Sequence, residues 1–590
     1  MIQFQIISKR KANRRDFYFL IIIIGFITSY CLNYDSKLLK TKTSEHSSFS
    51  KLDNLTRAPK SSTTHDPIYI KEDNWSSFDV VTGNGTALDP YVISDLIIDA
   101  RNNDENCIEI EESEAYSIIR NCTFINGRNG LVLRDASFCS IVENNVVNNT
   151  NSGILLSNLK NCSFTGNTII CMKKNSGYFW SIGTGINIIN LKNCSFNQNL
   201  VLNCPLNGIY LKDSENCIVT ENSIENSTLY GINLQNSENC ILLQNSIGEG
   251  SKRGIYVSES NNCTLNGNII NITTRDGIIF SKSNNCKLFQ NQIYGSGISL
   301  YSSFNNQIDT SNKANSKIIH LYENIQGISL IREPNVAQVI LINCSNSQIM
   351  NLKISETSMG ISVQNSQNCT IKNNEIADSN YGIDFKYSQN CTIKNNEITD
   401  SDYGIDFKYS QNCFVNGNIV KNIASTGIFF LSTENCTIDT NSVENISDCG
   451  IGIQFSENCT ILGNSILNTE DTGIMLLFSK NCTLTRNFIT NSSKFGIRLY
   501  FSCNCSITEN LITHNKYGIY LAIGSCDNLV WNNTLSNNSE KDILDDGVNN
   551  LIIGIGLPLI LSLILIILIS FLGIGGIITG IFLLLKKKMD

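Results

Sequence analysis

The stretch YGIDFKYSQNC occurs twice in this chain, at residues 381–391 and 403–413, and each copy carries an acid and a base. If the copies stack, Asp384 and Asp406 lie about 5 Å apart, close to the carboxylate separation of retaining glycosidases. Lys386 and Lys408 follow two positions later on the same outward face. These four residues are therefore candidates for carbohydrate-cleaving chemistry.

A structural interpretation of the same residues is favoured. Asp and Lys two positions apart on an exposed strand form a solvated, charge-balanced face, and duplication copies whatever lies on it. A catalytic pair needs environments that separate the two pKa values, whereas a repeat supplies nearly identical ones. The sequence predicts no cofactor and no metal site. Calcium bound by Asp378, Asp400 and Asp402 in the adjacent turn is the one alternative left open.

A column of cysteines follows the same repeat. A metal cluster requires converging thiolates, whereas one Cys per repeat gives a line. In-register neighbours on parallel strands have poorly oriented Cβ vectors for disulfides, so buried packing is the favoured interpretation. Real disulfides are expected among the other cysteines, and Cys171 and Cys204 flank one insertion. The column contains Cys139, Cys162, Cys194, Cys217, Cys240, Cys263, Cys286, Cys369, Cys391, Cys413, Cys436, Cys459, Cys482 and Cys505.

The spacing around these cysteines predicts the fold. A Gly stands nine residues before each column Cys, an apolar residue two after, an Asn five after, and Ile or Val seven after. Cys and the residue two later share a face, which is the strand period, and units of 22–23 residues must stack to bury a core. The prediction is an all-β, right-handed parallel β-helix of about 18 coils, because the leucine-rich repeat frame is absent.

The repeated positions have mechanical roles in this prediction. Each Gly is expected to supply a backbone angle at a coil corner, and each Asn to adopt a left-handed turn conformation and stack its amide on the next coil. The predicted structural ladder contains Cys369, Cys391, Cys413, Asn374, Asn396, Asn418, Gly382 and Gly404. The repeat also forms glycosylation sequons, and the predicted sites include Asn368, Asn390, Asn435, Asn458 and Asn481.

The two ends of the sequence predict an extracellular location for the repeat region. Residues 1–32 are interpreted as a signal peptide or signal-anchor and 33–70 as a polar linker. The β-helix is predicted over 71–545, with a connector at 294–345 that interrupts the regular repeat. Residues 551–585 carry no charge and predict a transmembrane helix, and the lysines of 586–590 predict a cytoplasmic tail. The net charge of −8 argues against a nucleic-acid partner.

The repeat SQNCTIKNNEI, the segment GNGTALDPYVISDLIIDA (83–100) and the segment HLYENIQGISLIREPNVAQVILINCSNSQIMNLKIS (320–355) resemble NosD-like right-handed β-helix proteins of archaea and some bacteria. The resemblance covers about residues 80–540 and implies the fold. The family is named after a periplasmic protein implicated in copper delivery. Copper favours His, Met or exposed Cys, and the four His and six Met here form no cluster in the sequence, so copper handling is disfavoured.

Three functions follow as hypotheses. The leading one is a membrane-anchored extracellular scaffold or binding protein that contacts carbohydrate or cell-envelope components. The second is a polysaccharide lyase or glycoside hydrolase on the outer face, and the third is copper handling. Enzymes on this fold build clefts from long loops, whereas this array is regular apart from one modest insertion and the connector. Regularity therefore favours binding over catalysis.

Overall fold

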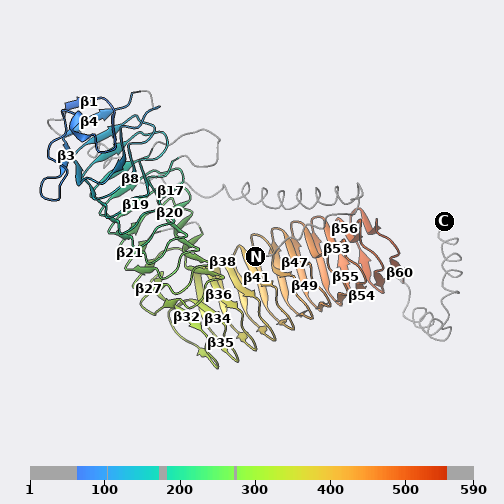
Figure 1. Ribbon diagram of the computed structural model, residues 1–590. Helices are drawn as coiled ribbons and strands as arrows, with labels where there is room; N and C mark the ends of the chain where they lie inside the picture. Colours follow the sequence, from blue (N-terminus) through green and yellow to red (C-terminus); the bar gives the residue numbers. More distant parts are fainter. Residues whose placement is uncertain (1–62, 102–103, 172–182, 272–274, 554–590) are drawn as a thin grey trace, which may run out of the picture. The chain divides into compact units, whose positions relative to one another are not determined.

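The structure is a computed structural model that describes residues 63–101, 104–171, 183–271 and 275–553 (Figure 1). These residues belong to one compact unit. They form mainly parallel strands and one short 3₁₀ helix, η1 (Trp75–Ser77), with no α-helix in the described ranges. The predicted all-β fold is confirmed: the chain winds as a right-handed parallel β-solenoid in which successive strands of one sheet come from successive coils.

The N-terminal coils are held together by in-register parallel sheets. One ten-stranded sheet runs from β2 (Ile68–Lys71) to β29 (Ile298–Tyr301), and a second from β3 (Tyr91–Ser94) to β30 (Gln307–Ile308). Each coil repeats the register of the one before, because the side-chain pattern recurs with the coil length. Ile and Leu of alternate positions therefore line up inside the solenoid as a continuous core.

The C-terminal coils follow the same plan. An eleven-stranded sheet runs from β33 (Ser329–Ile331) to β60 (Leu551–Ile553). A neighbouring sheet includes β36 (Lys353–Gln364), β38 (Glu375–Lys386), β41 (Tyr403–Lys408), β44 (Ile428–Leu431) and β47 (Cys449–Gln454). The duplicated segments lie in β38 and β41. Phe385 and Phe407 stack inside the core with ring centroids 4.8 Å apart.

The predicted connector at 294–345 contains the strand that joins the two cores. β34 (Val336–Ile342) is buried along its whole length, on both faces. Val339 and Leu341 belong to the core of the C-terminal coils, whereas Ile340 and Ile342 belong to that of the N-terminal coils. A strand covered on both sides needs continuous apolar residues, which explains the run VAQVILI and its departure from the repeat.

The repeated glycines are required for space, and the predicted role in backbone angle is wrong. Gly382 and Gly404 do not have positive φ values. A Cβ at Gly382 would lie 2.5 Å from Cγ2 of Ile398 and 2.7 Å from the carbonyl oxygen of Gly404 in the next coil. Each glycine thus lets an inward Ile and the neighbouring backbone approach closely, and this contact recurs from coil to coil.

The predicted asparagine ladder is present inside the solenoid. Nδ2 of Asn374 donates to Oδ1 of Asn396 at 2.9 Å, and Nδ2 of Asn396 donates to Oδ1 of Asn418 at 3.0 Å. All three side chains are buried. The predicted left-handed conformation is wrong for these residues, because the positive φ belongs to the preceding residue, such as Asn373 (53°) and Asn395 (52°). The extra bend before the ladder residue turns its amide into the core.

The cysteines divide as the spacing predicts. All fourteen column cysteines are buried with free thiols, and these thiols donate weak hydrogen bonds to backbone carbonyls, as Cys391 Sγ does to Gln389 O at 3.2 Å. Off the column, Cys171 is joined to Cys204, and Cys503 to Cys526. The second pair corrects the argument against in-register disulfides, because these residues face each other on adjacent coils with Cα atoms 4.6 Å apart.

The solenoid extends beyond its predicted ends. The linker predicted to reach residue 70 is wrong in its last part, because β1 (Thr63–His65) and β2 are already strands. The transmembrane helix predicted from residue 551 is also wrong at its start, since Leu551–Ile553 form β60 and pair with β57 (Leu529–Trp531). No helix within the described residues is long and apolar enough to cross a membrane. The predictions for 1–32, 33–62, 554–585 and 586–590 lie outside the described residues.

Candidate functional site

The duplicated acid–base pairs lie side by side on adjacent coils. Asp384 is the strand partner of Asp406, and Lys386 is the partner of Lys408. Nζ of Lys386 lies 2.8 Å from Oδ2 of Asp384, and Nζ of Lys408 lies 2.5 Å from Oδ2 of Asp406. The predicted charge balance is thus present. The predicted solvation is wrong, because Asp384 and Asp406 are 0% and 1% exposed.

The edge of the N-terminal sheet covers this face. β29 is the last strand of its sheet, and its edge packs beside β36. The side chain of Gln338 accepts from the Ile298 N–H at 2.9 Å and donates to the Ile298 carbonyl at 2.5 Å. Gln364 donates to the Leu300 carbonyl at 2.7 Å. These carboxamides replace the missing neighbouring strand, because an edge strand otherwise leaves its peptide groups unpaired.

Polar side chains complete the contact around the duplicated pairs. Ser299 Oγ donates to Asp276 Oδ1 at 2.6 Å and lies 3.3 Å from Ser358 Oγ. Nδ2 of Asn380 donates to the carbonyl of Arg275 at 3.1 Å. The residues on the outer face of β36 and β38 therefore belong to an interface between coils that are far apart in the sequence.

The two copies have different electrostatic surroundings. Lys386 Nζ lies 4.8 Å from the ring centroid of Tyr301, which β29 contributes, whereas Lys408 Nζ lies 5.6 Å from that of Tyr381. Burial, and then the charge of Asp384, raise the pKa of Asp406 to about 6, although Lys408 opposes the shift. Burial also raises the pKa of Tyr301 well above its usual range.

This cluster is a buried packing contact in the described structure. Oδ1 of Asp384 and Oδ1 of Asp406 have no hydrogen-bond partner among the described residues. A carboxylate without exposed surface does not contact a polymer, so neither Asp touches a substrate while the two sets of coils are packed. Sequence reasoning missed this burial because the covering strand lies about 80 residues earlier in the chain.

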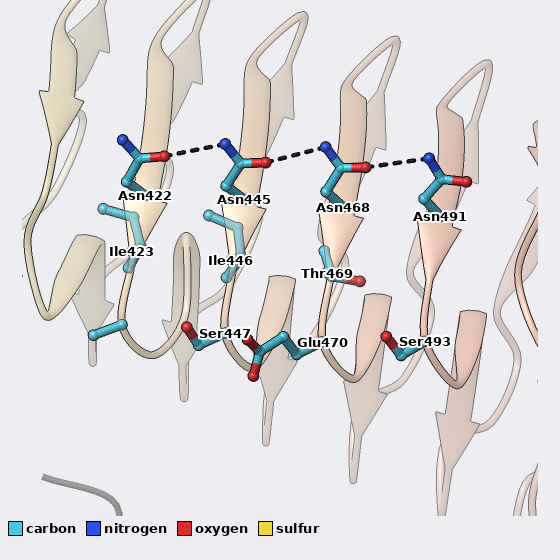
Figure 2. Close-up of a pocket in the computed structure, with 11 residues that line it drawn as sticks. Asn422, Ile423, Asn445, Ile446, Ser447, Asn468, Thr469, Glu470, Asn491 and Ser493 are labelled. Atoms are coloured by element: carbon cyan, nitrogen blue, oxygen red, sulfur yellow. Dashed lines mark hydrogen bonds between the residues drawn. The ribbon is translucent and has the colours of Figure 1, made fainter. Parts of the chain in front are cut away.

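A second feature, an open groove with a cavity volume of about 590 Å³, lies on the C-terminal coils (Figure 2). Its upper wall in the figure is a row of exposed asparagines, Asn422, Asn445, Asn468 and Asn491. Nδ2 of each of the last three donates to Oδ1 of the one before, at 3.1, 3.0 and 3.2 Å. Figure 2 shows this row above Ile423, Ile446 and Thr469, with Ser447, Glu470 and Ser493 on the opposite rim.

The asparagine groove presents a periodic set of hydrogen-bonding groups. A carboxamide has two donor hydrogens and two acceptor lone pairs. Each interior Asn of the row donates one hydrogen bond to the Asn before it and accepts one from the Asn after it. One donor hydrogen and one acceptor lone pair of its carboxamide therefore remain for solvent or a ligand. All four residues have positive φ values between 56° and 60°, which Asn tolerates better than most residues. The sequence signal was an Asn or Asp nine positions after each column Cys from Cys369 to Cys482, and sequence reasoning used only its acidic members.

The other predicted sites lie on exposed corners. Asn368, Asn390, Asn435, Asn458 and Asn481 are exposed and directly precede buried column cysteines. Their glycosylation stays a prediction.

The predicted calcium turn contains three carboxylates. Asp378 and Asp400 are exposed, and Oδ1 of Asp400 accepts a hydrogen bond from Asn422 at 3.0 Å. Within the described ranges, no group of three or more His, Cys, Asp or Glu residues is arranged to hold a metal ion. Calcium in this turn stays the open alternative of the sequence analysis.

Two protein-family models match the chain, and they cover different parts of it. One, described as "Right handed beta helix region", matches residues 338–489 and 403–554. The other, described as "Periplasmic copper-binding protein (NosD)", matches residues 58–181 and 170–329. A search of curated proteins finds no match.

Solved structures with related folds share little sequence with the chain. A mutant of the periplasmic alginate epimerase AlgG is 15% identical, with a TM-score of 0.29, over 57% of this chain and 77% of that one. The A-module of the mannuronan C-5 epimerase AlgE4 from Azotobacter vinelandii is 11% identical, with a TM-score of 0.25, over 62% and 91%. A GH87 α-1,3-glucanase catalytic domain in complex with nigerose is 13% identical, with a TM-score of 0.29, over 42% and 65%.

The coil architecture and the first family model define the class: this is a right-handed parallel β-helix protein. The second model matches the N-terminal coils and agrees with the repeat motifs. The chain is a NosD-like parallel β-helix repeat protein.

The three histidines that the structure describes do not converge on a copper site. His65, His320 and His514 lie on different coils, in or next to β1, β32 (Lys317–Glu323) and β55 (Leu511–Thr513). The described part of the chain has no cluster of three potential ligands. The copper binding named in the family description therefore has no such ligand cluster among the described residues, and copper handling stays the alternative that the sequence disfavours.

Proposed function

We propose that this protein is an extracytoplasmic β-helix scaffold that binds a linear, uncharged polysaccharide or a similar cell-envelope polymer along its asparagine groove. The observation that carries the proposal is the exposed row Asn422, Asn445, Asn468 and Asn491, with its unused donor and acceptor on each coil. Carbohydrate hydroxyl groups are both donors and acceptors, so amides are suitable partners for them.

The repeat of the groove supports a polymer as the ligand. Adjacent coils are separated by about 4.8 Å, which is similar to the length of one hexose unit in an extended glycan. Successive sugars could therefore meet equivalent amides on successive coils. Each contact is weak, but several contacts on one chain add through effective concentration. A groove of this kind favours long ligands over monosaccharides.

Cleavage of a polysaccharide at Asp384 and Asp406 is the alternative. The pKa of about 6 for Asp406 is suited to a general acid, but both carboxylates lack exposed surface. Binding without cleavage is therefore the better-supported function.

An extracytoplasmic location is part of this proposal. The description of the matching family model as periplasmic supports it, as do the two disulfides, which persist in oxidising compartments. Anchoring by the uncharged segment within 554–585 rests on its composition alone.

Affinity electrophoresis and calorimetry of the full-length protein with neutral and acidic polysaccharides test the proposal. Asn445→Ala combined with Asn468→Ala should weaken binding at least tenfold, while reducing sugar is not released. The matched control is Asn239→Ala with Asn412→Ala, which removes two exposed asparagines that lie at another corner and in no glycosylation sequon. Equal binding by both double variants would contradict the groove, and sugar release that Asp406→Asn abolishes would establish the alternative.

A further inference from the structure

One corner of the C-terminal coils carries a column of exposed rings with a gap in it. The residues in question directly follow the strands β38, β41, β44, β47 and β50 (Thr472–Leu477), and they turn outward at the corner. In successive coils these residues are Tyr387, Tyr409, Ser432, Phe455 and Phe478, which we call the corner column. Tyr387 stacks on Tyr409 with centroids 4.9 Å apart, and Phe455 stacks on Phe478 at 5.1 Å.

Ser432 interrupts the stacking. Tyr409 and Phe455 are separated by two coil steps, or about 10 Å, with only the serine between them. A ring placed halfway would have its centroid about 5 Å from each aromatic ring, which matches the spacing of the existing stacks. Tyr409 is 47% exposed and Phe455 is 53% exposed, so the faces that border the gap are accessible from solvent.

Polar side chains lie in the neighbouring column. Two residues after the corner, the same three coils present Gln411, Glu434 and Glu457, which are bridge partners from coil to coil. Nε2 of Gln411 lies 3.3 Å from Oε2 of Glu434, and both side chains are exposed. The carboxylates accept hydrogen bonds from hydroxyl groups and repel anionic groups, so the gap suits an uncharged polyhydroxylated ring.

We infer that the gap over Ser432 is a binding site for one pyranose ring of a neutral glycan, held between Tyr409 and Phe455. The C–H faces of the sugar pack on the negative faces of the aromatic rings, and Glu434 accepts hydrogen bonds from its hydroxyls. The site lies at the end of β44 opposite to the asparagine groove, because Asn422 precedes that strand and Ser432 follows it. The inference therefore does not depend on the groove.

Filling the gap is the sharpest test. Ser432→Tyr should complete the column, and the backbone accepts it because Ser432 has φ 52° while Tyr409 at the same position has 54°. Calorimetry on the full-length protein with cellohexaose, laminarihexaose and mannohexaose, and with hexaguluronate as the anionic comparison, measures the effect. At least one neutral hexasaccharide should bind. Its affinity should fall at least tenfold in Ser432→Tyr and in Tyr409→Ala.

The matched control is Tyr387→Ala, which removes an identical exposed ring that does not border the gap. It should change the affinity less than twofold. Unchanged affinity in Ser432→Tyr, preference for hexaguluronate, or no binding of any neutral hexasaccharide overturns the inference. Self-association that Ser432→Tyr abolishes also overturns it, since a ring from a second copy would then be the occupant. If the Asn445→Ala, Asn468→Ala protein loses binding and Ser432→Tyr does not, the proposed binding along the asparagine groove is supported and the proposed site over Ser432 is refuted.

Discussion

Replacement of Asp406 by Asn tests the electrostatics of the buried interface. Burial raises the pKa of Asp406 from its usual 3.8 to about 6 in the folded protein. A carboxyl whose pKa is raised on folding makes the folded state less stable as the pH rises, because the unfolded chain releases that proton first. A pKa shift of about 2 units corresponds to about 3 kcal/mol of folding free energy. The folded state loses this stability between about pH 4 and pH 6, and the loss stays constant above pH 6.

Asp406→Asn removes this titration while keeping the shape of the side chain. The wild-type protein should lose about 3 kcal/mol relative to the variant between about pH 4 and pH 7. Denaturant unfolding of both proteins at several pH values, followed by circular dichroism, measures the difference, and titrating groups that do not interact with Asp406 cancel in the subtraction. Asp400→Asn serves as the control, since it removes one exposed charge from the same coil. A difference that does not vary with pH would refute the reasoning.

Three further predictions concern the interior of the solenoid. Asn418→Ala removes a carboxamide that accepts two hydrogen bonds and donates two, so thermal or denaturant unfolding should show a loss of about 3–5 kcal/mol, against less than about 1 for the exposed Asn445→Ala. Gly404→Ala places a Cβ against the carbonyl of Gly427, and a folding-yield assay should show it to be more damaging than Ser432→Ala. Alkylation followed by mass spectrometry should leave the column thiols unmodified in the native protein and label them after unfolding, whereas native labelling of most of them would contradict their burial.

The repeat predicted the solenoid well because its information is local and copied many times. Cys, Asn and Ile at fixed offsets report which positions face inward, and Asn396 and Cys391 lie where that pattern puts them. Local conformation was harder to predict. The tight approach of Gly404 to the next coil and the left-handed residue before each ladder Asn depend on distances between coils, which a single-coil pattern does not contain.

The candidate site could be predicted only in part. The pairing of Asp384 with Asp406 follows from the 22-residue step, and it is observed. Their burial depends on β29, which belongs to a different set of coils. Nothing in the sequence of the duplicated segment indicates that this strand covers it. The exposed asparagine row was present in the sequence, but Asn is so frequent in this repeat that one more recurring offset did not stand out.

The carboxamide of Gln338 has a consequence for how the two sets of coils stay joined. The sheet that ends at β29 ends inside the molecule, against β36, where its peptide groups are shielded from water. Gln338 is buried and pairs with both the N–H and the carbonyl of Ile298, so one side chain supplies two of the hydrogen bonds that a next strand would have made. The regular repeat can therefore be interrupted at this point without leaving the buried peptide groups of Ile298 unpaired.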